Sequence, residues 1–104
     1  MVTILGAGIS GISAGYHLSL LNKENIIYES RSSWGGLLDY REVKYANVIF
    51  DFERSKNLAI VKSFLKEKGI LTCGRFGEWE YYWSDQSLMS GKNIIEKIVA
   101  NKNE

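Results

Sequence analysis

The stretch "TILGAGISGISAGYHL", residues 3–18, decides the fold. It opens inside a short apolar, β-branched run at 2–5, which favours a buried strand. Glycines follow at once, and apolar residues then recur at helical spacing up to about Leu21. We expect a helix from Ile9 to about Leu21, ending at Asn22-Lys23, with an apolar stripe made of Ile9, Ile12, Tyr16 and Leu20.

A second apolar run, "NIIYE" at 25–29, predicts another buried strand. Strand, glycine turn, helix and strand together make a βαβ unit. Its two strands should be parallel and its crossover right-handed.

The glycines of the first turn predict phosphate binding. Gly6, Gly8 and Gly11 fit the pattern G-x-G-x-x-G. The first permits a tight turn, the second lets a pyrophosphate approach the backbone, and the third lets helix and strand pack closely. The amino end of the helix then offers free N–H groups to the phosphates. The alternative is a glycine-rich turn in an ordinary βαβ unit, and Gly15 adds another close contact in either case.

An acid completes this pattern. Glu29 follows the last glycine of the motif at close to the spacing of about 20 residues at which an acid accepts hydrogen bonds from a ribose. An acid there repels a 2′-phosphate, so NADP is disfavoured. Whether the dinucleotide is FAD or NAD stays open on these residues. Gly35 and Gly36 suggest a second close backbone approach, although a plain glycine turn explains them equally well.

The rest of the chain is predicted to form further helices and short β segments. After a polar loop at 30–38, "YANVIFDF" (45–52) predicts a β segment and "RSKNLAIVKSFLKEKG" (54–69) an amphipathic helix with its apolar stripe at Leu58, Val61 and Leu65. "ILTC" (70–73) predicts a short strand, and "GRFGEWEYYW" (74–83) a loop. The final helix should begin near Ser84-Asp85 and end near Ala100.

Composition excludes several function classes. The net charge is +1, which gives no reason to expect a nucleic-acid partner. No apolar run is long enough to span a bilayer, so no membrane partner is expected. The single cysteine, Cys73, excludes an intrachain disulfide and favours the cytoplasm. Cys73 is expected to act as a small buried hydrophobe, His17 has no metal or catalytic partner nearby, and no metal site is expected.

A family resemblance extends this interpretation. Residues 1–38 are similar to the beginning, and residues 44–99 to the carboxyl-terminal end, of FAD-dependent amine-oxidase-like proteins, a group that includes protoporphyrinogen-oxidase-like proteins and relatives of UDP-galactopyranose mutase. The resemblance implies that Gly74 and Arg75 lie near the ribityl and pyrophosphate part of FAD, and that Trp83 and Asp85 lead to the flavin ring. The long middle of the family is absent, with the join at "DYREVK" (39–44).

These observations predict an α/β chain with a minimal Rossmann-like, three-layer fold. Its short parallel sheet should have the order second, first and last strand, with about three helices around it. We expect one domain over 1–104, divided into a βαβ part (1–38), a join with an extra β segment (39–52) and an αβα part (53–104). Exposed sheet edges would favour self-association.

The predicted function is that of the FAD-binding domain of an amine-oxidase-like flavoprotein oxidoreductase, with NAD as the alternative cofactor. No catalytic residue can be nominated, and turnover by this short chain alone is not expected. The alternative is a non-catalytic dinucleotide- or ADP-binding module or remnant, or a relative of UDP-galactopyranose mutase. The expected cofactor-binding residues are Gly6, Ala7, Gly8, Ile9, Ser10, Gly11, Glu29, Ser30, Arg31, Gly35, Gly36, Leu37, Gly74, Arg75, Trp83 and Asp85.

Overall fold

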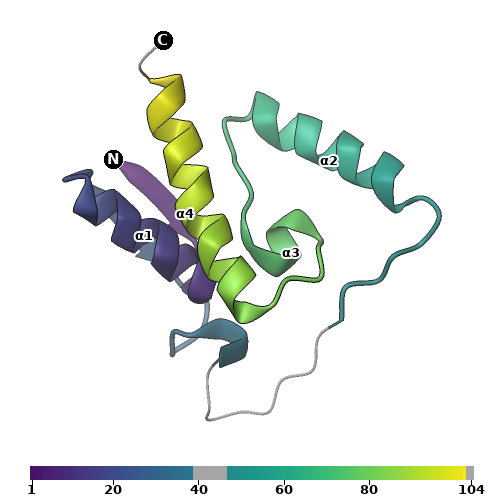
Figure 1. Ribbon diagram of the computed structural model, residues 1–104, viewed down its shortest axis with the longest axis horizontal. Coiled ribbons are helices and arrows are strands. Elements are labelled where there is room, and N and C mark those ends of the chain that lie inside the picture. The colour runs from purple at the N-terminus through teal and green to yellow at the C-terminus, as the bar shows by residue number, and fades with distance from the viewer. Residues whose placement is uncertain (39–46, 103–104) are drawn as a thin grey trace.

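A computed structural model describes residues 1–38 and 47–102 of the chain. Its elements alternate between strands and helices in the amino-terminal part and are helical thereafter (Figure 1). In chain order they are β1 (Val2–Leu5), α1 (Ile9–Leu20), β2 (Asn25–Tyr28), the short 3₁₀ helix η1 (Gly36–Leu38), α2 (Arg54–Glu67), α3 (Gly74–Glu78) and α4 (Ser84–Asn101).

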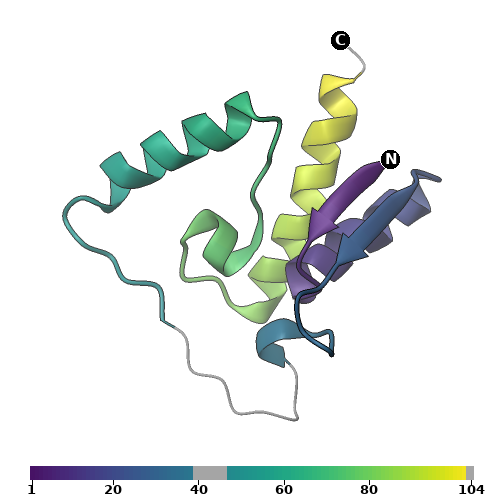
Figure 2. The ribbon, with the colours of Figure 1, turned by 180° about the vertical axis from the view of Figure 1, so that it is seen from behind.

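The βαβ unit forms as the sequence predicts. β1 and β2 pair in parallel, with Val2 opposite Asn25 and Leu5 opposite Tyr28, and Figure 2 shows the two strands side by side. Helix α1 connects them and ends at Leu20, with Leu21 as its C-cap, and the next residue, Asn22, takes a left-handed conformation with φ of 53°. The predicted strands and the helix between them are therefore confirmed.

The buried face of α1 is not the predicted apolar stripe. Tyr16 and Leu20 are 59% and 60% exposed, and Ile12 also lies at the surface. The residues that α1 buries are small ones and a single leucine: Gly11, Ser13, Ala14, Gly15 and Leu18. The prediction was wrong because it assumed that the largest apolar side chains face the core, whereas close backbone packing here selects small residues.

Helix α4 explains this choice, because it lies directly against α1 (Figure 1). At Gly91 a Cβ would lie only 2.3 Å from the backbone oxygen of Ser10, so the two helices touch through their backbones. Two serine hydroxyls of α1 donate to carbonyls of α4, from Ser10 Oγ to Ser87 O at 2.8 Å and from Ser13 Oγ to Leu88 O at 2.7 Å. The core that these helices form with β1 consists of Ala14, Leu18 and Ile95, with Val2, Ile4, Ile94, Ile98 and Val99 packed against it.

The sheet differs from the prediction in its size. Among the described residues it has two strands, and residues 70–73 are not a strand but an irregular segment. The ends of that segment bond elsewhere: Ile70 N donates to Leu65 O and Gly74 N to Ser90 Oγ. Residues 47–52 also lack strand structure, while 45–46 of the same predicted segment lie outside the described residues. The α/β class and the minimal Rossmann-like fold are confirmed, but the third strand was wrong.

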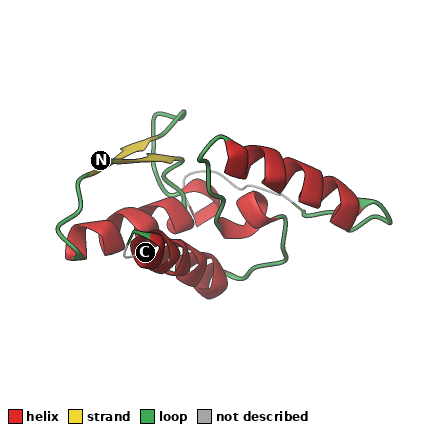
Figure 3. Ribbon diagram, turned by 90° about the horizontal axis from the view of Figure 1, so that it is seen from above, coloured by secondary structure: helices red, strands yellow, loops and turns green. Residues whose placement is uncertain are grey.

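The predicted third layer is also absent from the described part of the chain. Figure 3 shows α1 and α4 on the same side of the sheet. The residues that face the other side are exposed, namely Thr3, Leu5, Ile26 and Tyr28. Each strand therefore alternates between a half-buried and an exposed face, and neither is buried on both faces as expected.

Helix α2 lies apart from this core (Figures 1 and 2). The helix and the glycine after it were predicted correctly, since Gly69 has a positive φ of 71° and Ile70 N closes the last turn on Leu65 O. Its apolar stripe is only partly covered, however, because Leu58 and Leu65 are half-buried and Val61 is 52% exposed. Polar contacts attach it instead: Arg54 bonds Trp79 O and Glu80, and Lys62 pairs with Glu78.

The stretch at 74–83 is not wholly the loop that was predicted, because its first five residues form α3. The final helix begins at Ser84 as predicted and ends at Asn101, one residue beyond the predicted end. Within the described residues, no helix is long and apolar enough to cross a membrane.

Candidate glycine-lined nucleotide site

The turn between β1 and α1 has the geometry that its glycines predict. Gly6 has a φ of 102° and donates its N–H to Tyr28 O at 2.7 Å, which ties the turn to β2. A Cβ on Gly11 would lie 1.9 Å from the carbonyl oxygen of Gly6, so any other residue here would force the backbone to shift. Gly15 makes the same kind of contact with the sheet, where a Cβ would lie 2.9 Å from Ile27 Cδ1.

Gly8 differs from these glycines because the space beside it is open. No heavy atom lies within 4 Å of the position that a Cβ would take. Gly8 is also the residue before the first turn of α1, whose leading N–H groups have no acceptor within the helix. A ligand phosphate could therefore approach the backbone here and accept hydrogen bonds at the positive end of the helix dipole.

Glu29 lies at the base of the glycine turn. Its Oε2 accepts a hydrogen bond from Ala7 N at 2.8 Å, and its Oε1 accepts one from Arg31 N at 3.1 Å. The bond from Ala7, followed by the bond from Arg31, lowers the pKa of this carboxyl from its ordinary value, and the Ser30 hydroxyl adds to the effect. Glu29 is therefore ionised at neutral pH and fixed next to the turn.

The second pair of glycines lies against the first turn. Gly35 N donates to Ala7 O at 2.8 Å, and Gly35 and Gly8 form a parallel bridge. Both Gly35 and Gly36 have positive φ angles, of 110° and 59°. A Cβ on Gly36 would lie 3.1 Å from the Cα of Gly8, so the close approach seen here is between two backbone segments of the protein. The close approach of this pair to a cofactor stays a prediction.

A third glycine segment comes from the carboxyl-terminal part of the chain. Gly74 has a φ of 84°, and a Cβ there would lie 2.6 Å from Ser10 Oγ in the first turn of α1. The next residue, Arg75, is oriented by its surroundings: its guanidinium lies 4.9 Å from the centre of the Tyr81 ring and donates to Tyr82 O at 3.4 Å. Residues far apart in the sequence thus meet at the amino end of α1.

A cavity of about 440 Å³ lies between these three segments. The predicted site residues that line it are Gly6, Gly8, Ile9, Ser10, Gly11, Gly35, Gly36, Leu37, Gly74 and Arg75. Other predicted residues do not line it: Ala7, Glu29, Ser30 and Arg31 lie around the base of the turn. Trp83, which is 79% exposed, and Asp85 at the start of α4 also lie outside this lining.

Sequence reasoning missed part of the lining. The predicted site residues do not include Phe76, Tyr82 or Ser87, yet all three line the cavity. For Ser87 a signal existed, because it lies one turn after Ser84 on α4, the helix expected to meet the cofactor. Tyr82 carried no such signal, since its place depends on how α3 turns back toward α4.

Two further residues were considered in the sequence, Cys73 and His17. Cys73 lines the cavity, but burial, with a smaller contribution from Glu78, raises the pKa of its thiol, so the nucleophilic thiolate is disfavoured. His17 Nδ1 lies 2.7 Å from Ser13 O, a local contact within α1. Over residues 1–38 and 47–102, no cluster of His, Cys, Asp and Glu could hold a metal ion.

Comparison with known families identifies the fold. Residues 4–57, just over half of the chain, match the family described as NAD(P)-binding Rossmann-like domain. The chain belongs to this Rossmann-like family. No curated protein and no solved structure matches it.

The Rossmann-like match includes both glycine groups and Glu29, and it ends in the first turn of α2. It therefore also spans residues 39–44, where the amine-oxidase resemblance places a join. Gly74 and Arg75 lie beyond the matched residues. Family membership thus supports a dinucleotide-binding domain, and it leaves the choice between FAD and NAD undecided.

Proposed function

We propose that this chain binds FAD in the glycine-lined cavity and acts as the cofactor-binding part of an amine-oxidase-like flavoprotein oxidoreductase. One observation carries the proposal. Three glycine segments, around Gly8, Gly35 and Gly74, line a single cavity at the amino end of α1. Its volume of about 440 Å³ falls in the range typical of small-molecule sites.

The residues present fit the ADP part of such a cofactor. The open space beside Gly8 admits a pyrophosphate, and the first turn of α1 supplies N–H donors to it. Arg75 adds a positive charge to the lining. Glu29 Oε2 accepts one hydrogen bond, from Ala7 N, and Oε1 accepts two, from Arg31 N and Ser30 Oγ. Since an ionised carboxylate offers about four acceptor positions, Oε2 can still accept a hydrogen bond from a ribose hydroxyl.

The preference for FAD over NAD depends on the resemblance and on what surrounds Gly74. In amine-oxidase-like proteins the carboxyl-terminal strand end and the following helix meet the flavin, and here Gly74, Arg75 and Ser87 line the same cavity as the amino-terminal glycines. When bound, the flavin would supply the hydride chemistry. The chain's own residues would hold the phosphates, orient the ribose and exclude water from one side of the cofactor.

A second candidate is a non-catalytic module that binds ADP or NAD. It is favoured by the exposed positions of Trp83 and Asp85, because the residues expected near the flavin ring lie outside the cavity lining. In this case the site would recognise only the nucleotide half of a cofactor.

The test is retention of flavin by the purified chain. FAD is added, free cofactor is removed by desalting, and the visible flavin absorbance of the protein fraction is recorded. The proposal predicts a retained flavin band that Gly8→Val abolishes and that Gly69→Asn leaves intact. Gly69 is a matched control, since it also has open space around it, lies outside the cavity and has a left-handed φ that Asn tolerates. Absence of flavin together with binding of ADP or NAD would favour the second candidate, and absence of all three would refute both.

A further inference from the structure

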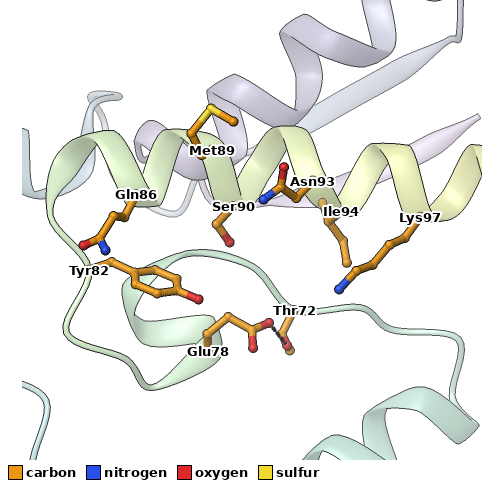
Figure 4. Close-up of a pocket in the computed structure, with 9 residues that line it drawn as sticks. All are labelled: Thr72, Glu78, Tyr82, Gln86, Met89, Ser90, Asn93, Ile94 and Lys97. Atoms are coloured by element: carbon orange, nitrogen blue, oxygen red, sulfur yellow. Dashed lines mark hydrogen bonds between the residues drawn. The ribbon is translucent and has the colours of Figure 1, made fainter.

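A second cavity, of about 320 Å³, lies between α4 and the segment formed by residues 72–82. It shares only Tyr82 with the glycine-lined cavity. It is lined by Thr72, Glu78, Tyr82, Gln86, Met89, Ser90, Asn93, Ile94 and Lys97 (Figure 4). The dinucleotide proposal gives these residues no role.

The helical repeat of α4 brings part of this lining to one face. Gln86, Ser90, Ile94 and Lys97 follow one another at spacings of three or four residues. Figure 4 shows their side chains directed toward α3 and the 70–73 segment, from which Glu78 and Thr72 face back, together with Tyr82 of the loop after α3. Polar and apolar groups therefore converge on the same space from both sides.

The charges in this cavity do not cancel. Glu78 is already neutralised, because it pairs with Lys62 and accepts a hydrogen bond from Thr72 Oγ1 at 2.8 Å. Within 1–38 and 47–102, Lys97 takes part in no ion pair, while the nearby Lys92 pairs with Glu96 on the same helix. The cavity thus holds one uncompensated positive charge, and it would favour an anionic ligand.

Neutral donors lie on the Tyr82 side of this charge. Ser90 Oγ accepts from Gly74 N, so its own proton remains to be donated. The Tyr82 hydroxyl is a second donor. Gln86 lies at the far end of the cavity, 11 residues before Lys97 on α4, which is about 16 Å along the helix axis.

The other walls are apolar. The ring of Tyr82 and the side chain of Ile94 face the cavity together. A phosphate would call for several charged or backbone donors, such as Arg or a helix amino end, whereas one lysine beside an aromatic ring suits a single carboxylate on a flat apolar body.

We propose that this cavity binds a small aromatic carboxylate. Lys97 would pair with the carboxylate, Ser90 would donate to it, and Tyr82 and Ile94 would contact the ring. The proposal does not depend on cofactor binding in the other cavity, and either one can fail alone.

The test uses the full chain, labelled with ¹⁵N and titrated with sodium benzoate as the probe. The proposal predicts saturable shifts at the amides of Ser90, Ile94 and Lys97. Lys97→Met should weaken binding about tenfold, since a hydrogen bond to a charged group contributes roughly that much. Lys92→Met, the matched control on the same helix, should bind as wild type does. Benzamide, which has nearly the same shape and no charge, should bind about tenfold more weakly than benzoate.

Several results would overturn the proposal. Benzoate could cause no saturable shifts at these amides, or it could shift only Gly8 and Gly36 in the other cavity. Equal affinity for benzamide, or an unchanged affinity in Lys97→Met, would exclude a role for the charge. Inorganic phosphate binding as tightly as benzoate would exclude recognition of the aromatic body. Retention of FAD by the same sample tests the proposed function separately.

Discussion

Gly11→Ala should unfold this protein at a much lower temperature than Gly8→Ala, although both change one glycine of the same motif. At Gly11 the added Cβ would lie 1.9 Å from the carbonyl oxygen of Gly6 and 3.1 Å from its carbon. Both atoms belong to the backbone, so no side chain can turn aside, and β1 and α1 must separate. At Gly8 the added Cβ meets nothing within 4 Å.

The expected size of the effect follows from the cost of overpacking. Inserting a methyl group into a filled space costs about 1–3 kcal/mol, and a contact this close should cost about 3 kcal/mol. For a chain of this length each 1 kcal/mol lowers the Tm by roughly 4–8 °C, so Gly11→Ala should lower it by roughly 12–24 °C. Gly8→Ala should leave the Tm within about 4 °C of wild type, which corresponds to less than about 1 kcal/mol.

The assay is thermal unfolding followed by circular dichroism at 222 nm, with cofactor binding measured on the same samples. Gly8→Ala should keep the fold and lose affinity for the nucleotide, because its Cβ occupies the space through which the pyrophosphate approaches. If the two variants melt at the same temperature, the close contact between Gly11 and Gly6 is not a feature of the folded protein, and the reasoning fails.

Four further predictions concern other parts of the fold. Gly91→Ala should lower the stability by about 2–3 kcal/mol in urea unfolding, because its Cβ would lie 2.3 Å from Ser10 O; an unchanged midpoint would mean that α1 and α4 do not touch there. Because the pKa of Glu29 is lowered in the folded protein, its hydrogen bonds stabilise the fold above the ordinary pKa near 4.5, and this stability is lost as the pH falls through the pKa of the folded state. Between pH 6 and acid unfolding, Glu29→Gln should therefore lose less free energy of unfolding than wild type. Parallel curves of unfolding free energy against pH for the two proteins would contradict this. Phe64→Ser on α2 should change the stability by less than about 0.5 kcal/mol, as for other exposed positions, and a larger loss would show that α2 packs against a partner surface. The unpaired edges of the two-stranded sheet predict self-association, which sedimentation velocity would detect as a concentration-dependent increase in mass. A monomer at every concentration would refute this prediction.

The amino-terminal third of the chain was predictable because its signals are local. Glycine spacing and β-branched runs specify the turn and both strands without reference to the rest of the molecule. The carboxyl-terminal helices were also predictable from periodicity, as α2 and α4 show. Gly11 is the clearest case, since the sequence motif and the 1.9 Å contact give the same reason for the residue.

The wrong predictions concern residues whose structure depends on tertiary contacts. Residues 70–73 have strand composition, yet Ile70 N donates to Leu65 O of α2 and Gly74 N to Ser90 Oγ of α4. Within the described residues, no strand pairs with this segment. The apolar side chains of α1 were assigned to the core, but the neighbouring helix selects the face with Gly11, Ala14 and Gly15. Hydrophobic periodicity could not reveal this, because it ignores how closely two backbones approach.

The cavity itself was predictable in part. The glycine groups at 6–11 and 35–36 carried local signals, whereas Gly74 was assigned from the family resemblance. That all three line one cavity depends on how α4 packs on α1. Contacts such as Ser10 Oγ to Ser87 O join segments 77 residues apart and have no signature in a single sequence. Tyr82 reaches the cavity only through the turn of α3, which composition alone assigned to a loop.

The most direct test of the central claim is a map of amide chemical shifts in the ¹⁵N-labelled chain titrated with FAD. If the three glycine segments form one dinucleotide site, the amides of Ile9, Gly36 and Gly74 should shift together with a single saturation curve. Those of Ser63 and Lys66 on α2 should not move, because α2 lies apart from the cavity. Shifts confined to one segment, or none at saturating FAD, NAD and ADP, would contradict the account.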